Sequence, residues 1–247
     1  MLMIKKIFFF FLLFSIFTSS VSAALAQELP EKSGVYNVPG NPKLKLWVFA
    51  HDRGKPAPTP PAATCTDNDS ASVVGPTGWR LPPGSWGYRL NTASVPSSVG
   101  SANIAAVTTT AFDRWSTAST NAVTFSNIGA TSTDRANLDG QNIIAWGRTQ
   151  GTALGVTYTW YDRATGLAIE TDTIMNKKFS WSLNICSPNS YDAQDILTHE
   201  LGHWMGLNDE YDSIYVDNTM YGYGSKGEVK KSTPATGDIF GIQNIYQ

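Results

Sequence analysis

Apolar and polar residues alternate in short runs through the second half of the chain, and this period of two predicts β-strands. Turn residues such as Asp139-Gly140 and Thr165-Gly166 separate the runs. The predicted strands are Trp86–Asn91, Ala122–Ser126, Asn142–Trp146, Gly155–Tyr161 and Leu167–Met175.

Three segments show helical spacing instead. Apolar residues recur every three or four positions over Ala102–Trp115. A second helix is predicted over Tyr191–Met205 with Asn189 or Ser190 as its cap, and a third over Thr236–Tyr246. Strands and helices in the order β-α-β-β-β-β-α-α predict a mixed sheet covered by helices, which is an α+β fold.

Residues 27–78 have a different composition. They hold eight of the 13 prolines, and only Leu44–Ala50 has the alternation of a strand. We interpret this segment as a Pro-rich N-terminal arm that lies on the domain or as a propeptide. Residues 79–247 then form the main domain.

Residues 1–26 have the pattern of a signal peptide. Lys5 and Lys6 precede an apolar run over Ile7–Phe17, and Ala24-Leu25-Ala26 forms a cleavage site with small residues. The run is too short to span a bilayer comfortably. We therefore expect a secreted protein, extracellular or periplasmic, with no membrane attachment after cleavage.

Composition narrows the classes of partner. Hydrophobic residues make up 42% of the chain, which excludes wholesale disorder. Charged residues make up 15% and the net charge is −2, so no electrostatic attraction to nucleic acid or anionic lipid is expected. We expect a monomer.

Two cysteines, Cys65 and Cys186, are present. In an oxidising compartment such a pair most simply forms one disulfide, which would tie the arm to the main domain. The alternative is that the Cys65 thiolate binds a metal as a latch.

The stretch His199-Glu200-Leu201-Gly202-His203 indicates a metal site. The chain has three histidines, and two of them lie four residues apart here, so in a helix both rings project from one face. Zinc suits this spacing, because catalytic zinc takes three N or O ligands and keeps one position for water. Glu200, about 100° around the helix from His199, can address that water as general base. The other interpretation, two ordinary histidines and a surface glutamate, predicts nothing about the residues that follow.

The third ligand is predicted to be Asp209. Gly206 can end the helix in a left-handed turn, which would bring the chain back toward the metal. Asp209 lies six residues after His203, where the extended motif H-E-x-x-H-x-x-G-x-x-H has its third ligand. Glu228 is the weaker alternative, because its neighbours Gly227 and Lys230 are typical of a solvated loop.

With this motif the chain resembles the metzincin metallopeptidases and, within them, the matrixins. The resemblance covers Trp79 to Gln247. It also rests on Asp217-Asn218-Thr219-Met220-Tyr221, similar to the Met-turn, on Thr236–Tyr246, similar to the closing helix, and on Trp79-Arg80, Tyr88-Arg89-Leu90, Ala111-Phe112-Asp113-Arg114-Trp115 and Val123-Thr124-Phe125.

The resemblance implies a metzincin-type catalytic domain: a twisted mixed sheet of about five strands, an active-site helix, the Met-turn and a C-terminal helix. Met220 would support the metal site from below without binding the ion. Leu154–Trp160 would be the edge strand on which a peptide adds antiparallel, and Tyr221–Tyr223 would shape a primed-side pocket. The residues expected to pair with the substrate are Leu154, Gly155, Val156, Thr157 and Tyr158.

The chain also departs from the family. An aspartate as third ligand resembles the snapalysin-type small neutral proteases. The cysteine-switch motif is missing, and His51, the one spare histidine, lies outside the matching region, so a second, structural zinc is not expected. Calcium is a weaker candidate at Asp134, Asp139, Asp162 and Asp172, since turn chemistry accounts for most of these residues.

These features predict a secreted zinc metalloendopeptidase that acts on proteins or peptides. Zinc would be held by His199, His203 and Asp209, and Glu200 would move protons to and from the reacting groups. The alternative is a secreted, zinc-stabilised binding or adhesion module without catalysis. The presence of Glu200 argues against it, because only the reaction needs that carboxylate.

Overall fold

A computed structural model describes residues 28–53, 65–149 and 151–247. The predicted signal peptide, residues 1–26, lies outside the described residues, as does part of the Pro-rich arm.

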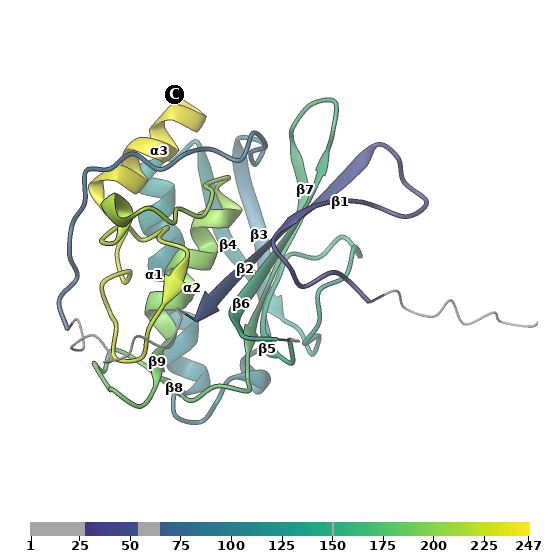
Figure 1. Cartoon of the computed structure of the whole chain (residues 1–247). Helices are drawn as coiled ribbons and strands as arrows, with labels where there is room; N and C mark the ends of the chain where they lie inside the picture. Colours follow the sequence, from purple (N-terminus) through teal and green to yellow (C-terminus); the bar gives the residue numbers. More distant parts are fainter. Residues whose placement is uncertain (1–27, 54–64, 150) are drawn as a thin grey trace, which may run out of the picture.

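One large mixed sheet organises the described residues, which contribute eight strands to it (Figure 1). The order is β1-β2-β6-β7-β5-β3-β4, and β10 pairs with β2. The five predicted strands are confirmed as β3 (Gly84–Leu90), β4 (Val123–Ala130), β5 (Ile143–Gly147), β6 (Ala153–Asp162) and β7 (Ala168–Asn176). The other three are β1 (Gly34–Asn37), β2 (Leu44–Arg53) and β10 (Tyr223–Gly224), while β8 (Trp181–Ser182) and β9 (Tyr191–Asp192) form a separate small pair.

Strand β6 is not at the edge of the sheet, so that prediction is wrong for this structure. Strand β2 of the N-terminal arm pairs antiparallel with β6 along its length, from Leu44 opposite Asp162 to Asp52 opposite Ala153, and β7 pairs with the other side. The strand Leu44–Ala50 was itself predicted. Its partner lies about a hundred residues further along the chain, and alternation within a strand does not say which strand it pairs with.

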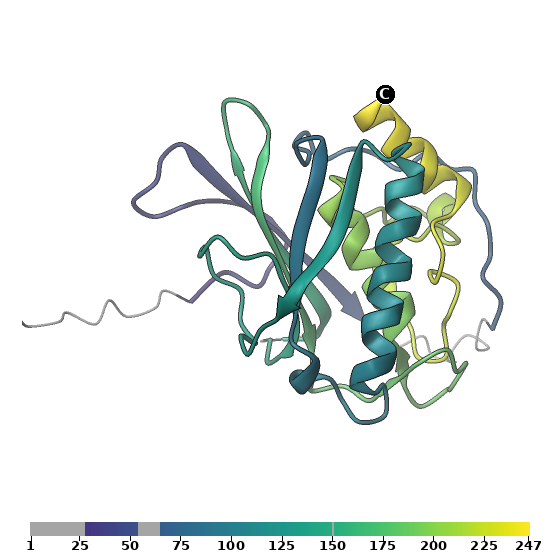
Figure 2. The ribbon, with the colours of Figure 1, turned by 180° about the vertical axis from the view of Figure 1, so that it is seen from behind.

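The described residues form three α-helices: α1 (Ser101–Ala118) and α2 (Ala193–Trp204) pack on the sheet, and α3 (Thr236–Tyr246) packs against α1. Helices α1 and α2 lie on the same side of the sheet, as Figures 1 and 2 show from opposite directions. Helix α2 begins two residues later than predicted, and its cap is Asp192 rather than Asn189 or Ser190. The Asp192 carboxylate accepts hydrogen bonds from the first backbone amides of the helix, those of Gln194 and Asp195.

Two apolar cores lie on the two faces of the sheet. The larger, between sheet and helices, contains Trp115, Trp146 and Trp204. The alternation in β2 divides its side chains between them: Leu46 and Val48 enter the smaller core, and Phe49 enters the larger one. Two-sided burial fixes the register of β2, because a slip of one residue would exchange the faces.

A disulfide joins Cys65 to Cys186, which confirms the predicted pair and contradicts a metal-binding Cys65 latch. The chain after Cys65 runs along the main domain, where the Val74 amide donates to the Gly237 carbonyl and the Thr77 amide to the Gly206 carbonyl. No helix within the described ranges is long and apolar enough to cross a bilayer.

Candidate metal centre

Helix α2 and the bend after it bring together the three predicted ligands. His199 and His203 are both fully buried, with ring centroids 4.8 Å apart. Gly206 has φ +92°, so the helix ends in the left-handed conformation that the sequence predicted. The chain then returns and places Asp209 Oδ1 at 3.2 Å from His199 Nε2 and 3.5 Å from His203 Nε2.

Backbone carbonyls orient both imidazoles. His199 Nδ1 lies 2.7 Å from the Thr219 carbonyl oxygen, and His203 Nδ1 lies 3.0 Å from that of Leu207. A carbonyl only accepts, so each Nδ1 carries the proton and each Nε2 presents a lone pair. This is the tautomer that metal-binding histidines adopt when the other ring nitrogen donates to the protein.

The donor atoms fit a metal ion. His199 Nε2, His203 Nε2 and Asp209 Oδ1 are buried, and none has a hydrogen-bond partner in the part of the chain that is described. Bonds of about 2.0–2.1 Å to a tetrahedral ion put neighbouring ligand atoms about 3.3 Å apart, close to the two distances measured here. Three buried donors that face one point without a proton between them leave that point for a cation.

Electrostatics hold Asp209 as an anion. Burial alone would raise the pKa of its carboxyl group, but the facing His203 and His199 rings lower it well below the ordinary value. Burial also lowers the pKa of His199 to about 3, so that ring is neutral and able to bind a metal at neutral pH. The other oxygen, Asp209 Oδ2, accepts a hydrogen bond of 3.3 Å from the Tyr211 hydroxyl.

Glu200 lies beside this site without belonging to it. Its Oε2 accepts a 2.6 Å hydrogen bond from the Thr157 hydroxyl, while its Oε1 has no hydrogen-bond partner among residues 28–53, 65–149 and 151–247. Burial raises the pKa of Glu200 to about 7, although His203 and the Thr157 hydroxyl act in the opposite direction. Gly155 makes room for the carboxylate, since a Cβ there would lie 2.5 Å from Oε1. A carboxylate with one fixed and one free oxygen, and a pKa near neutrality, suits a general base.

Met220 lies fully buried against α2, as the resemblance implies. A Cβ on Gly202 would lie 2.3 Å from Met220 Sδ, so the absence of a side chain there allows the close approach. The Asp238 carboxylate of α3 accepts hydrogen bonds from the Thr219 and Met220 amides, at 2.9 and 3.1 Å. Helix α3 thereby fixes the turn whose Thr219 carbonyl orients His199.

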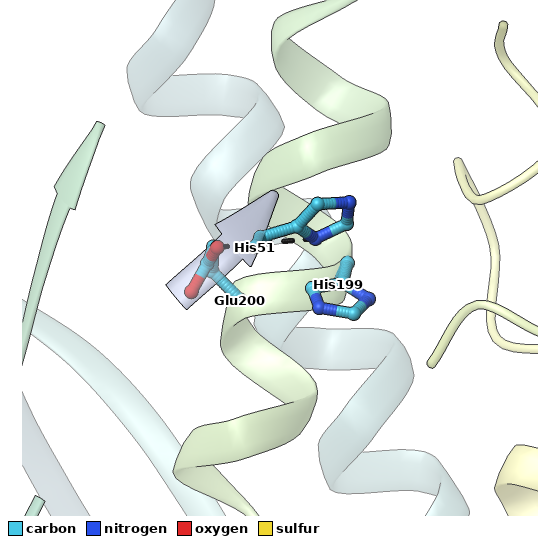
Figure 3. Close-up of side chains that lie close together, drawn as sticks. All are labelled: His51, His199 and Glu200. Atoms are coloured by element: carbon cyan, nitrogen blue, oxygen red, sulfur yellow. Dashed lines mark ion pairs between the residues drawn. The ribbon is translucent and has the colours of Figure 1, made fainter. Parts of the chain in front are cut away.

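Sequence reasoning missed His51. It lies in β2, one residue beyond the predicted strand, and its Nδ1 lies 4.0 Å from Glu200 Oε1 (Figure 3). His51, His199 and Glu200 form a second group of possible ligands, distinct from the group of His199, His203 and Asp209. The spacing along the chain gave no signal, because only the β2–β6 pairing brings His51 to α2. Thr157, Tyr211 and Asp238 were also missed as supporting residues, because no motif marks a hydrogen bond to a metal ligand, to the general base or to the turn beneath them.

The remaining candidates do not gather at the site. Glu228 accepts a hydrogen bond from the Ser225 amide and pairs with Lys230, so it is not a third ligand. Neither group of possible metal ligands found among the described residues includes the four aspartates considered for calcium. Asp172 instead accepts hydrogen bonds from the Asn137 and Ile143 amides and holds a loop.

Comparison with protein families gives a match over most of the chain. The family model Peptidase_M10, described as matrixin, matches residues 82–247, which is more than half of the chain and includes the whole of the candidate site except His51. The search of curated proteins finds no match.

Proposed function

The chain belongs to the matrixin family of metallopeptidases, and we propose that it is a secreted, zinc-dependent endopeptidase that hydrolyses peptide bonds in proteins. The observation that carries the proposal is the convergence of His199 Nε2, His203 Nε2 and Asp209 Oδ1 beside the free oxygen of Glu200. Three N or O ligands with a fourth position open are the donor set of a catalytic zinc site. A binding module would need the three ligands but not the glutamate.

When bound, zinc would supply a Lewis acid that polarises the scissile carbonyl and acidifies a water. Glu200 does the proton transfer. Its Oε1 takes the proton from the attacking water and later delivers it to the leaving amine, while Thr157 keeps Oε2 in place. Burial raises the pKa of Glu200 to about 7. A carboxyl group with this pKa can both accept the proton from water and donate it to the amine near neutral pH.

The substrate takes the position of β2. In this proposal an extended peptide pairs antiparallel with β6, using the backbone groups of Leu154, Gly155, Val156, Thr157 and Tyr158, as β2 does in the structure. The proposal thus keeps β6 as the substrate strand, although β6 is an interior strand here.

The disulfide and the N-terminal sequence support the proposal of secretion. The Cys65–Cys186 disulfide is typical of proteins outside the reducing cytosol, and the N-terminal segment has the pattern of a signal peptide. We propose that the mature protein acts as a monomer on proteins or peptides outside the cell or in the periplasm.

The test is the pair Glu200→Ala and Glu200→Gln. Both variants are expected to bind zinc stoichiometrically, as measured by elemental analysis, and to lose casein cleavage by at least about a hundredfold, because the proton acceptor is gone. Cleavage at the wild-type rate by either variant would remove Glu200 from the mechanism. A folded wild-type protein that binds no zinc would contradict the proposal as a whole.

A further inference from the structure

Strand β2 shows how an extended segment lies at the candidate site. On one side it pairs antiparallel with β6, where His51 is opposite Gly155. On the other it pairs parallel with β10, where Asp52 is opposite Tyr223 and Arg53 is opposite Gly224. An extended peptide in this position is therefore held from both sides, and the side chain at the place of His51 points toward α2.

That side chain is completely enclosed. His51 has no exposed surface, and its ring lies edge-on against the ring of His199, with centroids 3.8 Å apart. A Cβ on Gly224 would lie 3.0 Å from His51 Nε2 and 2.8 Å from both Ile196 Cδ1 and Leu154 Cδ1, so these groups surround one small space. We call this space, with Lys231 at its end, the His51 site.

Lys231 needs a polar partner from the occupant of the His51 site. It is fully buried, and its ammonium group donates to the carbonyl oxygens of Tyr221 and Tyr223, the latter at 2.7 Å. Its third contact is His51 Nε2 at 3.2 Å. An ammonium group has three donors and no acceptor, so the facing ring nitrogen must accept.

No other group replaces that acceptor. Within the described parts of the chain no carboxylate lies within 4.0 Å of Lys231 Nζ. Burial lowers the pKa of Lys231, and the more distant carboxylates of Glu228 and Asp195 raise it by attraction to the ammonium group. The two carbonyls belong to the wall of the site and stay there whatever occupies it. An apolar occupant would leave one donor of a buried cation unpaired, which is costly.

We propose that Lys231 determines specificity: the residue of a bound peptide that replaces His51 must carry a side chain that accepts a hydrogen bond, such as an amide, a carboxylate or an imidazole, and apolar side chains are disfavoured. This inference rests on the proposed function and names the class of peptide that the same site takes. If Lys231 instead only links Tyr221 to Tyr223, the nature of the occupant makes no difference.

The arm allows a test that does not depend on catalysis. In the full chain, His51→Gln and His51→Met have side chains of similar length, and only Gln offers an acceptor to Lys231. The measurement is hydrogen exchange of the backbone amides of β2 and β6, with the amides of α1 as the control for global folding. We expect β2 to exchange at least about tenfold faster with Met than with Gln, because the unpaired ammonium group favours local opening.

Equal exchange in the two variants would overturn the proposal. Zinc content, measured in the same samples, is expected to be equal, because His51 is not one of the three proposed ligands His199, His203 and Asp209. In a Lys231→Met background the order should reverse, with His51→Met at least as protected as His51→Gln. If that background fails to fold, the two single variants still decide.

The second arm of the test uses the enzyme. Peptides released from unfolded casein are sequenced by mass spectrometry, and cleavage sites with Glu, Gln, Asp, Asn or His at one fixed position are expected to be enriched at least about fivefold. Lys231→Met should remove this enrichment and favour Leu or Met there. Cleavage with no such preference contradicts the specificity inference alone. No cleavage by the wild-type enzyme after β2 has been released contradicts the proposed function and leaves the exchange measurement to decide the role of Lys231.

Discussion

The imidazole of His51 packs edge-on against the imidazole of His199, with ring centroids 3.8 Å apart. Phe49, two residues earlier in the same strand, stacks on His203 with centroids 3.9 Å apart. One strand of the N-terminal arm therefore covers both histidines of the candidate metal centre. Because β2 also uses the backbone of β6, a peptide that binds as proposed can reach the site only after β2 has left.

Separation of the arm from the main domain should therefore increase peptidase activity. We predict that a cut between Arg53 and Cys65, made at a site-specific protease sequence placed within residues 54–64, raises the rate of peptide cleavage at least about tenfold once β2 dissociates. Cys65 lies after the cut, so the Cys65–Cys186 disulfide does not hold the released segment to the main domain. The rate is measured with a fluorogenic peptide before and after cutting.

Two controls accompany the cut. The same insertion without protease treatment reports any effect of the new sequence, and the cut Glu200→Ala variant reports cleavage by contaminants. If the cut protein releases residues up to 53, as shown by size-exclusion chromatography and mass, yet gains no activity, β2 does not block the site.

The sequence alone predicted the parts of this site that lie close together in the chain. The four-residue spacing of His199 and His203, the left-handed bend at Gly206 and the return to Asp209 all lie within eleven residues, where helix geometry fixes the relative positions. The order of strands and helices was predictable for the same reason, because each element is recognised from the spacing of apolar residues within it.

The predictions that were wrong or missing concern residues that lie far apart in the sequence and meet only through strand pairing. Strand β6 was expected at the edge because nothing in its alternation reveals that β2 pairs with it. His51 and Lys231 meet across 180 residues of sequence, through the β2–β6 and β2–β10 pairings. A lone histidine within the Pro-rich segment, next to its one predicted strand, carries no sign of such a neighbour.

Thr157 is expected to set the pH at which the enzyme becomes active. Its hydroxyl donates to Glu200 Oε2 and lowers the pKa of that carboxyl group, which burial raises to about 7. Thr157→Val removes the donor, so the pKa of Glu200 rises and the ionised base is lost at a higher pH. We predict that the acid limb of kcat/KM moves upward by about one pH unit, since a hydrogen bond to a charged group is worth about 1.5 kcal/mol or more.

Thr159→Val is the matched control for this shift. Thr159 is also a buried threonine of β6, but its hydroxyl bonds to that of Thr171 and not to Glu200. Its acid limb should stay at the wild-type pH. An equal shift in both variants would show that the effect comes from the sheet and not from the hydrogen bond to the base.

Removal of the Asp209 carboxylate should weaken zinc binding, whereas removal of a nearby exposed carboxylate should not. Loss of an outer-shell partner of a metal ligand typically costs 10–100-fold in affinity, so loss of a ligand should cost at least about a hundredfold. We predict this decrease in zinc affinity for Asp209→Ala, measured by competition with a chelating dye. Asp212→Ala, at an exposed position three residues later, should bind zinc like the wild type. Equal affinity in both variants would remove Asp209 from the ligand set.

Gly202 is predicted to be intolerant of any side chain because Met220 lies against it. Gly202 lies in α2, the helix that carries both histidines. A Cβ added there would lie 2.3 Å from Met220 Sδ and 2.9 Å from Trp115 Cζ2. Alanine favours a helix over glycine by about 1 kcal/mol, but overpacking of a dense core costs about 1–3 kcal/mol. The balance is destabilising, and we expect Gly202→Ala to lower the free energy of unfolding by about 1 kcal/mol in urea.

A double-mutant cycle separates the contact with Met220 from a general effect on the helix. Met220→Ala removes the sulfur that the new Cβ would meet, so Gly202→Ala should cost less in that background. The contact with Trp115 persists in both backgrounds and cancels in the comparison. If Gly202→Ala is equally destabilising with and without the Met220 side chain, the two residues are not coupled, and Met220 does not support the helix from below in the way that its position indicates.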